Sequence, residues 1–305
     1  MSPGLIVICG PTATGKSSLA MAIAQKFSLP ILSADSRQVY QEFNIGTAKP
    51  TLREQQQVPH FLIDLVAPTA TLSVAQYQRQ AQSLIQQFQD QGIVPLLTGG
   101  TGLYIKSITH NLKIPRVAPH PQLRSQLGQW DQAILHHWLQ QVDSPSAQRI
   151  HPRDRLRTLR ALEVFYVTGK PLSQQQGESP VSYPILFLGL DLLDRTQQTQ
   201  RICDRTHQMF ALGWIEEVKG IVERYGPALP LLKTLGYAEI LDYLQGRANL
   251  PTTQQAIVRH TRQFAKRQRT WFRANPDIHW FDPSAPGAFE KMMESAALFL
   301  ESTAA

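Results

Sequence analysis

The feature that most constrains this chain is a phosphate-loop motif, Gly10-Pro11-Thr12-Ala13-Thr14-Gly15-Lys16-Ser17, which fits G-x-x-x-x-G-K-[ST]. Residues 5–9 before it form a continuous apolar run, as in a strand that is buried on both faces. Residues 18–27 after it carry apolar side chains at helical spacing. This order of strand, glycine turn and helix lets backbone N–H groups and the helix dipole bind a phosphate or diphosphate.

Two side chains of the motif have chemistry of their own. Lys16 supplies a point charge for the outer phosphates, and the Ser17 hydroxyl can ligate Mg²⁺. The alternative, a chance glycine turn between a strand and a helix, does not account for the Lys-Ser pair. We therefore expect a diphosphate to contact the loop residues Gly10, Pro11, Thr12, Ala13, Thr14, Gly15, Lys16 and Ser17.

Further short apolar runs at 30–34, 60–64, 93–97 and 185–190 alternate with helical patterns. They predict an α/β fold with a parallel sheet flanked by helices, similar to nucleoside kinases. From about residue 116 the β pattern stops, and helix-prone sequence continues to about 183. We therefore expect a core of residues 1–115 and 184–305 and a helical insertion domain of residues 116–183.

Polar residues follow several of these predicted strands. Asp35 follows the second, Asp64 ends the third, and a glycine-rich turn with Thr101 follows the fourth. Ligands of open α/β sheets bind at the carboxyl ends of the strands, which favours Asp35 as a site residue. Asp35 could equally be a turn or cap aspartate. Asp64 resembles a Walker B acid, which would favour an NTPase.

The charge pattern points to a polyanionic partner. The 305-residue chain has a formal net charge of +7, and we expect a long helix from Thr252 to about Asn275. Its cations recur at steps of three and four with no acid between 259 and 273, and its apolar residues form a separate seam. These cations are Arg259, Arg262, Lys266, Arg269 and Arg273, and the seam is Ile257, Phe264 and Trp271. A solvated charged face is the ordinary alternative to a surface that follows a phosphate backbone.

The remaining composition is consistent with a cytoplasmic protein. The two cysteines have no metal-ligand or disulfide spacing. The first predicted strand begins within five residues of the start, which leaves no room for a signal peptide, and no apolar run could span a bilayer. We expect no membrane partner.

Taken together, the motifs resemble the tRNA dimethylallyltransferases, also called tRNA isopentenyltransferases. The resemblance covers nearly the whole chain. It departs from the family pattern at Gly102, where a bulkier residue is expected, with little consequence anticipated. The bacterial members are the better match, because no zinc-finger spacing follows the basic helix. The matching segments are 10–17, Asp35-Ser36-Arg37-Gln38 with Tyr40, Gly46-Thr47-Ala48-Lys49-Pro50, Gly99-Gly100-Thr101 with Tyr104, His151-Pro152 with Asp154, 157–164, Gly169-Lys170, 205–213, Gly236-Tyr237 and 266–271.

The resemblance implies a reaction. A dimethylallyl group would move from dimethylallyl diphosphate to the exocyclic N6 of the adenosine 3′-adjacent to the anticodon in tRNA. The products would be N6-dimethylallyladenosine and diphosphate, with Mg²⁺ as cofactor and a monomeric enzyme.

The chemistry of this reaction suggests residue roles. Asp35 is the expected base, because it follows the strand that we expect next to the phosphate loop, and Lys16 and Arg205 would stabilise the leaving diphosphate. The resemblance implies that Thr101 bridges the reacting groups. The sequence leaves open whether Arg201 or Arg205 contacts the diphosphate. The implied tRNA-binding residues are Asp35, Ser36, Arg37, Gln38, Thr101, Arg124, Leu156, Arg157, Thr158, Leu159, Arg160, Lys233, Gly236, Tyr237, Lys266, Arg267, Gln268, Arg269, Thr270, Trp271 and Arg273.

Three other functions remain open at this point. A phosphate-loop kinase or NTPase would use Asp64 as a Mg²⁺ ligand. A dimethylallyltransferase acting on free adenine nucleotides would not need the basic helix. A non-catalytic RNA-binding module would not need both Lys16 and Asp35.

Overall fold

The computed structural model describes residues 3–304. The chain divides into two compact units. The first contains the residues up to 108 together with those from 182 onward, and the second contains 109–181. The second unit therefore begins before residue 116, the start expected for the insertion.

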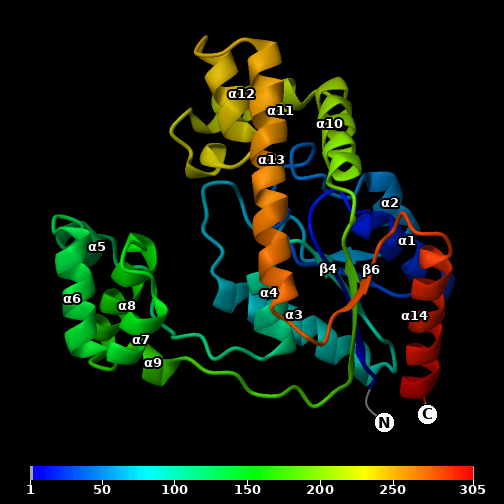
Figure 1. Cartoon of the computed structure of the whole chain (residues 1–305), viewed down its shortest axis with the longest axis horizontal. Coiled ribbons are helices and arrows are strands. Elements are labelled where there is room, and N and C mark those ends of the chain that lie inside the picture. Colours follow the sequence, from blue (N-terminus) through cyan, green and yellow to red (C-terminus); the bar gives the residue numbers. More distant parts are fainter. Residues whose placement is uncertain (1–2, 305) are drawn as a thin grey trace. The chain divides into compact units, whose positions relative to one another are not determined.

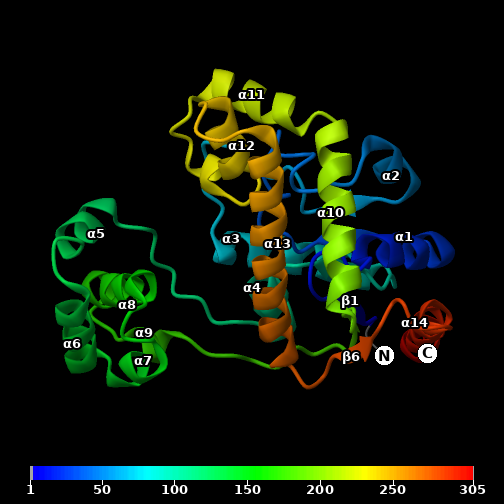
Figure 2. The same cartoon turned by 45° about the horizontal axis from the view of Figure 1, so that its top comes forward.

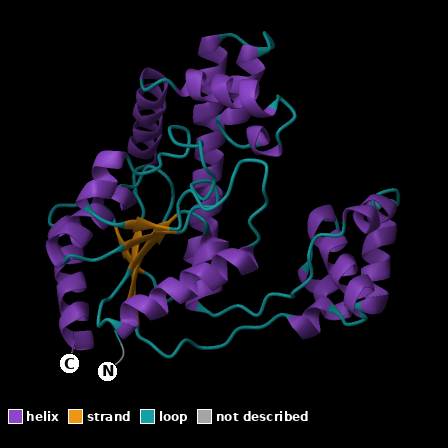
Figure 3. Ribbon diagram, turned by 180° about the vertical axis from the view of Figure 1, so that it is seen from behind, coloured by secondary structure: helices purple, strands orange, loops and turns teal. Residues whose placement is uncertain are grey.

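A six-stranded parallel sheet lies at the centre of the first unit, with strand order β3-β2-β4-β1-β5-β6 (Figure 3). β1, which leads into the phosphate loop, pairs with β4 and β5. β2 is one strand further away, so Asp35 does not follow a strand adjacent to β1. The strands are β1 Leu5–Cys9, β2 Ile31–Ser33, β3 His60–Phe61, β4 Leu96–Gly99, β5 Ile185–Leu190 and β6 His279–Phe281.

The alternation of side chains along β1 separates two hydrophobic clusters. Leu5, Val7 and Cys9 belong to the cluster that contains the apolar residues of α3 (Val74–Asp90) and α4 (Gly102–Thr109). Ile6 and Ile8 belong to the cluster that includes α1 (Lys16–Phe27) and α14 (Ala288–Ala304). Helices therefore cover both faces of the sheet, which explains why the residues of β1 are all apolar.

The helices α10 and α13 lie side by side along much of their length (Figures 1 and 2). Their contact brings residues about 60 positions apart in the chain close to the phosphate loop. The bounds of these two helices and of the remaining helical elements of this unit are α2 Leu52–Gln57, α10 Arg195–Ala211, α11 Trp214–Tyr225, the 3₁₀ helix η1 Pro230–Lys233, α12 Tyr237–Leu244 and α13 Leu250–Arg273.

Several predicted boundaries were wrong. β3 ends at Phe61, because Leu62 and Asp64 have positive φ angles of 64° and 53° that leave the extended conformation. β4 begins at Leu96 rather than at residue 93. α13 begins at Leu250, where the Asn249 side chain accepts a hydrogen bond from the Thr252 N–H, so Thr252 is not the cap.

The second unit is helical and has its own apolar core. Its best-buried charge is Glu163, which accepts hydrogen bonds from the side chains of Arg124 and Arg160 and from the His120 N–H. Burial alone would raise the pKa of Glu163, but these hydrogen bonds outweigh it and lower the pKa to about 2. The helices are α5 Pro121–Leu127, α6 Gln132–Val142, α7 Ser144–Arg149, α8 Arg155–Thr168 and α9 Leu172–Gln175.

We predict that Glu163→Gln lowers the free energy of unfolding of the second unit by about 3 kcal/mol at pH 7, because two arginines lose their buried counter-charge. The folded-state pKa of Glu163 lies below its usual value of 4.5. Its contribution is therefore present above about pH 4.5 and lost as the pH falls toward 2. Denaturant titration with hydrogen exchange of residues 109–181 measures this difference. Asp131→Asn, at an exposed cap that makes no side-chain hydrogen bond, is the matched control; an equal loss in both variants would contradict the prediction.

Candidate active site

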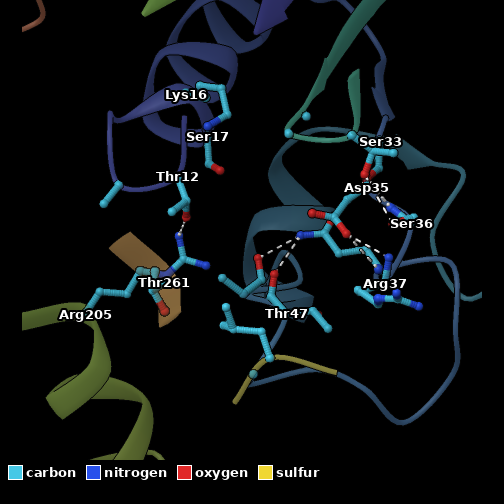
Figure 4. A pocket seen from close by; sticks show the side chains of 18 of the residues that line it. Thr12, Lys16, Ser17, Ser33, Asp35, Ser36, Arg37, Thr47, Arg205 and Thr261 are labelled. Atoms are coloured by element: carbon cyan, nitrogen blue, oxygen red, sulfur yellow. Dashed lines mark hydrogen bonds between the residues drawn. The ribbon is translucent and has the colours of Figure 1, made fainter. Parts of the chain in front are cut away.

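A cavity of about 420 Å³ opens in the first unit at the carboxyl ends of β1, β2 and β4 (Figure 4). One side is lined by the phosphate loop and by Arg205 of α10. Another is lined by the residues that follow β2 and β4, including Asp35 and Thr101. Residues of α13, residues 46–48 and 50, Trp214, residues 233–235 and Tyr237 also line it. The cavity therefore brings together both groups of predicted catalytic residues.

The phosphate loop has the backbone conformation that its glycines allow. Gly10 has φ 134°, and a Cβ there would lie 2.1 Å from the Leu190 carbonyl oxygen of β5. Gly15 has φ 91° and forms the N-cap of α1. Inside the loop, the buried Thr14 hydroxyl and the Lys16 Nζ both donate hydrogen bonds to the Pro11 carbonyl oxygen. The loop is thus a tight turn at the N-terminus of α1.

Two cations occupy this end of the cavity. Burial lowers the pKa of Lys16, and the nearby charge of Arg205 lowers it further, to about 8. Burial also lowers the pKa of Arg205, against an opposing effect of Asp35. Two partly desolvated cations in one cavity make it strongly attractive to an anion.

The structure distinguishes the two candidate arginines of α10. Arg205 donates a hydrogen bond to the Thr12 hydroxyl at 3.2 Å and lines the cavity (Figure 4). Arg201 is not among the residues that line it. Of the two arginines, Arg205 is therefore the one placed to contact a ligand of the phosphate loop.

On the opposite wall, two strand ends are held together by hydrogen bonds. Thr101 donates its N–H to the Ala34 carbonyl oxygen at 3.1 Å, and its hydroxyl accepts from the Ser36 N–H at 2.9 Å. Gly99 is needed for this approach, because a Cβ would lie 2.2 Å from the Ala34 oxygen. Asp35 accepts from the Arg37 N–H at 2.8 Å and remains partly exposed to the cavity. Asp35 and Thr101 are therefore positioned by one shared network.

The segment 44–50 is held over the cavity by an acidic residue that the sequence analysis missed. Glu217 of α11 accepts hydrogen bonds from the backbone N–H groups of Asn44, Ile45 and Gly46 and from the Tyr237 hydroxyl. No spacing in the sequence distinguishes Glu217 from its neighbour Glu216. It is recognisable only once α11 and α12 are packed together.

The contacts of Asp64 do not fit a Walker B acid, which would bind Mg²⁺. Asp64 binds the buried ammonium of Lys49 at 2.5 Å, and Lys49 also donates to Asn44 and to the Tyr40 carbonyl oxygen. Asp64 therefore anchors the segment 44–50. Gln38 has a similar anchoring function, since its side chain bonds Ser33 and the carbonyl oxygens of Thr47 and Ala48.

The predicted cationic stripe on α13 is only partly a free surface. Arg259, Arg262 and Lys266 are exposed. Arg269 and Arg273 instead bind the buried carboxylate of Asp191, which directly follows β5. The helix itself contains no acidic residue, so the sequence pattern did not indicate that Asp191 pairs with these two arginines.

The predicted apolar seam of α13 was also wrong, apart from Ile257. Phe264 and Trp271 are 38% and 42% exposed, whereas Ala265, Gln268 and Phe272 are buried. Trp271 packs against Gly102, where a Cβ would lie 2.1 Å from the indole. The departure at Gly102 therefore has a consequence, because it leaves room for this tryptophan.

The remaining predicted tRNA-binding residues of the first unit differ in exposure. Arg37, Arg267 and Thr270 are exposed, and Lys233 is exposed and lines the cavity. Gly236 and Tyr237 are buried against Trp214, a second residue that the sequence analysis missed. Trp214 and Tyr237 line the cavity, and Gly236 packs against Trp214.

In the second unit, the exposed members of the predicted set are Leu156 and Arg157. Thr158 is fully buried and donates its hydroxyl to the Asp154 carbonyl oxygen. Leu159 packs on the core of this unit. Arg124 and Arg160 are partly exposed but are held by Glu163. This set of residues is therefore a mixture of surface groups and internal supports.

The fold and cavity define a phosphate-loop α/β protein whose anion-binding loop faces a carboxylate and a hydroxyl across the same cavity. Residues 38–275 match the family model described as IPP transferase. The chain belongs to this family.

Relatives with similar sequences are named tRNA dimethylallyltransferase. The protein from Acaryochloris marina is 60% identical over 92% of this chain and 93% of its own length. The protein from Crocosphaera subtropica is 58% identical over 98% of this chain and 99% of its own length.

Solved structures give the same family. The tRNA isopentenylpyrophosphate transferase from Bacillus halodurans matches with a TM-score of 0.73 and 32% identity, over 98% of this chain and 97% of its own. A eukaryotic dimethylallyltransferase acting on tRNA matches with a TM-score of 0.83 and 27% identity, over 97% of this chain and 78% of that chain. Among the helices within residues 3–304, none is long and apolar enough to cross a membrane.

We predict that Glu217→Gln loosens the segment 44–46, because a carboxamide loses the negative charge and turns one N–H group toward other donors. Hydrogen exchange of the Asn44, Ile45 and Gly46 amides should accelerate by about tenfold or more, equivalent to roughly 1.4 kcal/mol. Glu216→Gln, at the exposed neighbour on α11, is the control and should leave these amides unchanged. Unchanged exchange in the Glu217 variant would show that the carboxylate does not hold the segment.

Proposed function

We propose that this protein transfers a dimethylallyl group from dimethylallyl diphosphate to the exocyclic N6 of an adenosine in tRNA, 3′-adjacent to the anticodon. The carrying observation is the cavity that places Lys16 and Arg205 on one side and Asp35 with Thr101 on the other. The names of the relatives and structural neighbours support the same substrate and reaction.

The leaving group is stabilised at the phosphate loop. As the allylic C–O bond breaks, negative charge develops on the diphosphate, and Lys16, Arg205 and the N–H groups at the start of α1 oppose it. An allylic diphosphate needs no nucleotide hydrolysis for this step. A kinase or NTPase would need Asp64 as a metal ligand, but Asp64 is engaged by Lys49.

The acceptor nitrogen is activated on the opposite wall. The adenine amine is a poor nucleophile because its lone pair is delocalised into the ring. As the C–N bond forms, the proton on N6 passes to the Asp35 carboxylate, a contribution of about 10²–10⁴-fold in rate. The hydrogen bonds from Arg37 and Gln38 hold Asp35 in place, and Thr101 fixes the turn beside it.

Mg²⁺ is the cofactor that best fits this donor set. Mg²⁺ at phosphate sites keeps several waters and takes one or two protein ligands plus substrate oxygens. The Ser17 hydroxyl lies at the exposed first turn of α1 and lines the cavity, which suits that coordination. When bound, the ion would neutralise charge on the diphosphate.

A tRNA acceptor fits the surface better than a free nucleotide. Arg259, Arg262, Lys266 and Arg267 are exposed on α13, whose Thr261, Phe264 and Gln268 line the cavity. Cations on this surface can follow a phosphate backbone while an unstacked loop adenine enters the cavity. By the resemblance to its family, we propose that the enzyme is a cytoplasmic monomer.

The proposal is tested with purified protein, unmodified tRNA, radiolabelled dimethylallyl diphosphate and Mg²⁺, followed by nuclease digestion. Label on the adenosine beside the anticodon is the expected result. Label on free AMP alone would replace tRNA with a nucleotide acceptor. ATP consumption without transfer of the label would favour the kinase function.

We predict that Asp35→Asn lowers kcat by about 10²–10⁴-fold, because the amide cannot take the N6 proton. tRNA affinity, measured by filter binding, should stay within about threefold, since most of it comes from phosphate contacts. Asp277→Asn, at an exposed aspartate that does not line the cavity, is the control. A parallel loss of tRNA affinity would show that Asp35 positions the RNA instead.

The lowered pKa of Lys16 predicts a pH-dependent donor affinity. In the free protein Lys16 loses its proton as the pH rises through about 8, whereas a bound diphosphate would favour the charged form. The affinity for dimethylallyl diphosphate should therefore fall by up to about tenfold per pH unit above 8, with proton uptake on binding.

Calorimetry in buffers of different ionisation enthalpy measures both effects. Lys16→Arg, which keeps its charge throughout this range, should flatten the pH profile between 8 and 10. An identical profile in both proteins would assign the titration to another group.

A further inference from the structure

The buried carboxamide of Gln268 on α13 connects two loops that are distant in the sequence. Its Oε1 accepts a hydrogen bond from the Thr12 N–H of the phosphate loop at 2.8 Å. Its Nε2 donates to the Gly100 carbonyl oxygen, in the turn after β4, at 2.9 Å. A neutral carboxamide offers an acceptor and a donor at the same planar end, and here both are used.

The contact with the turn is tight. A Cβ at Gly100 would lie 2.3 Å from the Gln268 Nε2, so no side chain fits between the turn and the carboxamide. Gln268 is only 7% exposed. The position of the carboxamide is therefore fixed by the phosphate loop on one side and by the turn after β4 on the other.

The neighbouring residues hold the bridge in place. Arg269 binds the buried Asp191 and also donates to the Gln198 side chain. Gln198 in turn donates to the Thr12 carbonyl oxygen at 3.2 Å. Together with Arg205 at the hydroxyl, α10 and α13 engage all three polar groups of Thr12.

We propose that Gln268 is a positioning residue that fixes the separation between the phosphate loop and the Gly99–Thr101 turn. This inference rests on the proposed function, in which the donor binds at the first loop and the acceptor at the second. The resemblance places Gln268 among the tRNA contacts, whereas its burial and its two backbone hydrogen bonds give it an internal position. Gln268 thus holds the two reactants at the distance that transfer requires.

The effect should fall on kcat. A displacement of about 1 Å between reacting atoms can lower a rate by about 100-fold while leaving each substrate bound. In Gln268→Glu one oxygen still accepts from Thr12, but the other faces the Gly100 oxygen and repels it. Gly100→Ala pushes the same carboxamide from the other side and is the independent second variant.

Steady-state kinetics on the full-length protein test the proposal. In both variants kcat should fall by about 10–100-fold, with KM for dimethylallyl diphosphate and for tRNA within about threefold. Gln87→Glu, exposed on α3, carries the same charge change and should retain full activity, because α3 contributes no residue to the cavity or to the predicted tRNA-binding set. A raised KM for tRNA at unchanged kcat in Gln268→Glu would make Gln268 an RNA contact and overturn the inference, as would unchanged kinetics.

A second readout does not depend on activity. Hydrogen exchange without substrate should accelerate in both segments, 10–14 and 99–101, in Gln268→Glu and in neither segment in Gln87→Glu. Acceleration in one segment alone would overturn the bridge even if the wild-type protein transferred no dimethylallyl group. Failure of the wild-type protein to transfer a dimethylallyl group would reject the proposed function, and the exchange measurement would still decide whether Gln268 bridges the two loops.

Discussion

Two cations that share one small cavity are the interaction on which the rest of this structure depends. Lys16 and Arg205 each lose hydration at the phosphate loop, and each has a lowered pKa. Such a pair favours a multiply charged anion, which supplies the charge that the protein leaves uncompensated. The supporting elements hold the phosphate loop in place: Arg205 of α10 donates to the Thr12 hydroxyl, and Gln268 of α13 accepts from the Thr12 N–H.

The order of the strands explains how the two halves of the chemistry meet. β4 lies between β1 and β2, so the turn after β4 is the neighbour of both the phosphate loop and the Asp35 segment. Glycines at 99 and 100 allow the backbone to approach Ala34 on one side and Gln268 on the other. The reacting groups are therefore brought together by the turns at the carboxyl ends of neighbouring strands. Side chains of α10, α11 and α13 hold these loops in place.

Much of this arrangement could be predicted from the sequence. Features that depend on local sequence, such as the buried run of β1, the phosphate loop and the strand 185–190, were predicted within a residue or two. Partners contributed by other elements could not be predicted. Asp35 and Asp191 both follow strands, yet Asp191 is 2% exposed and bound by three arginines, whereas Asp35 faces the cavity. The same reason explains why the cations of α13 seemed unpaired and why Glu217 and Glu163 were missed.

The central claim is that the phosphate loop holds a leaving diphosphate rather than the phosphate chain of a nucleotide. The most direct measurement is the stoichiometry of a complete reaction with tRNA, dimethylallyl diphosphate and Mg²⁺, with ATP present as a potential competitor. We predict one diphosphate released for each dimethylallyl group on tRNA, with the ATP concentration unchanged. Transfer that requires ATP hydrolysis, or diphosphate release without modified tRNA, would contradict the account.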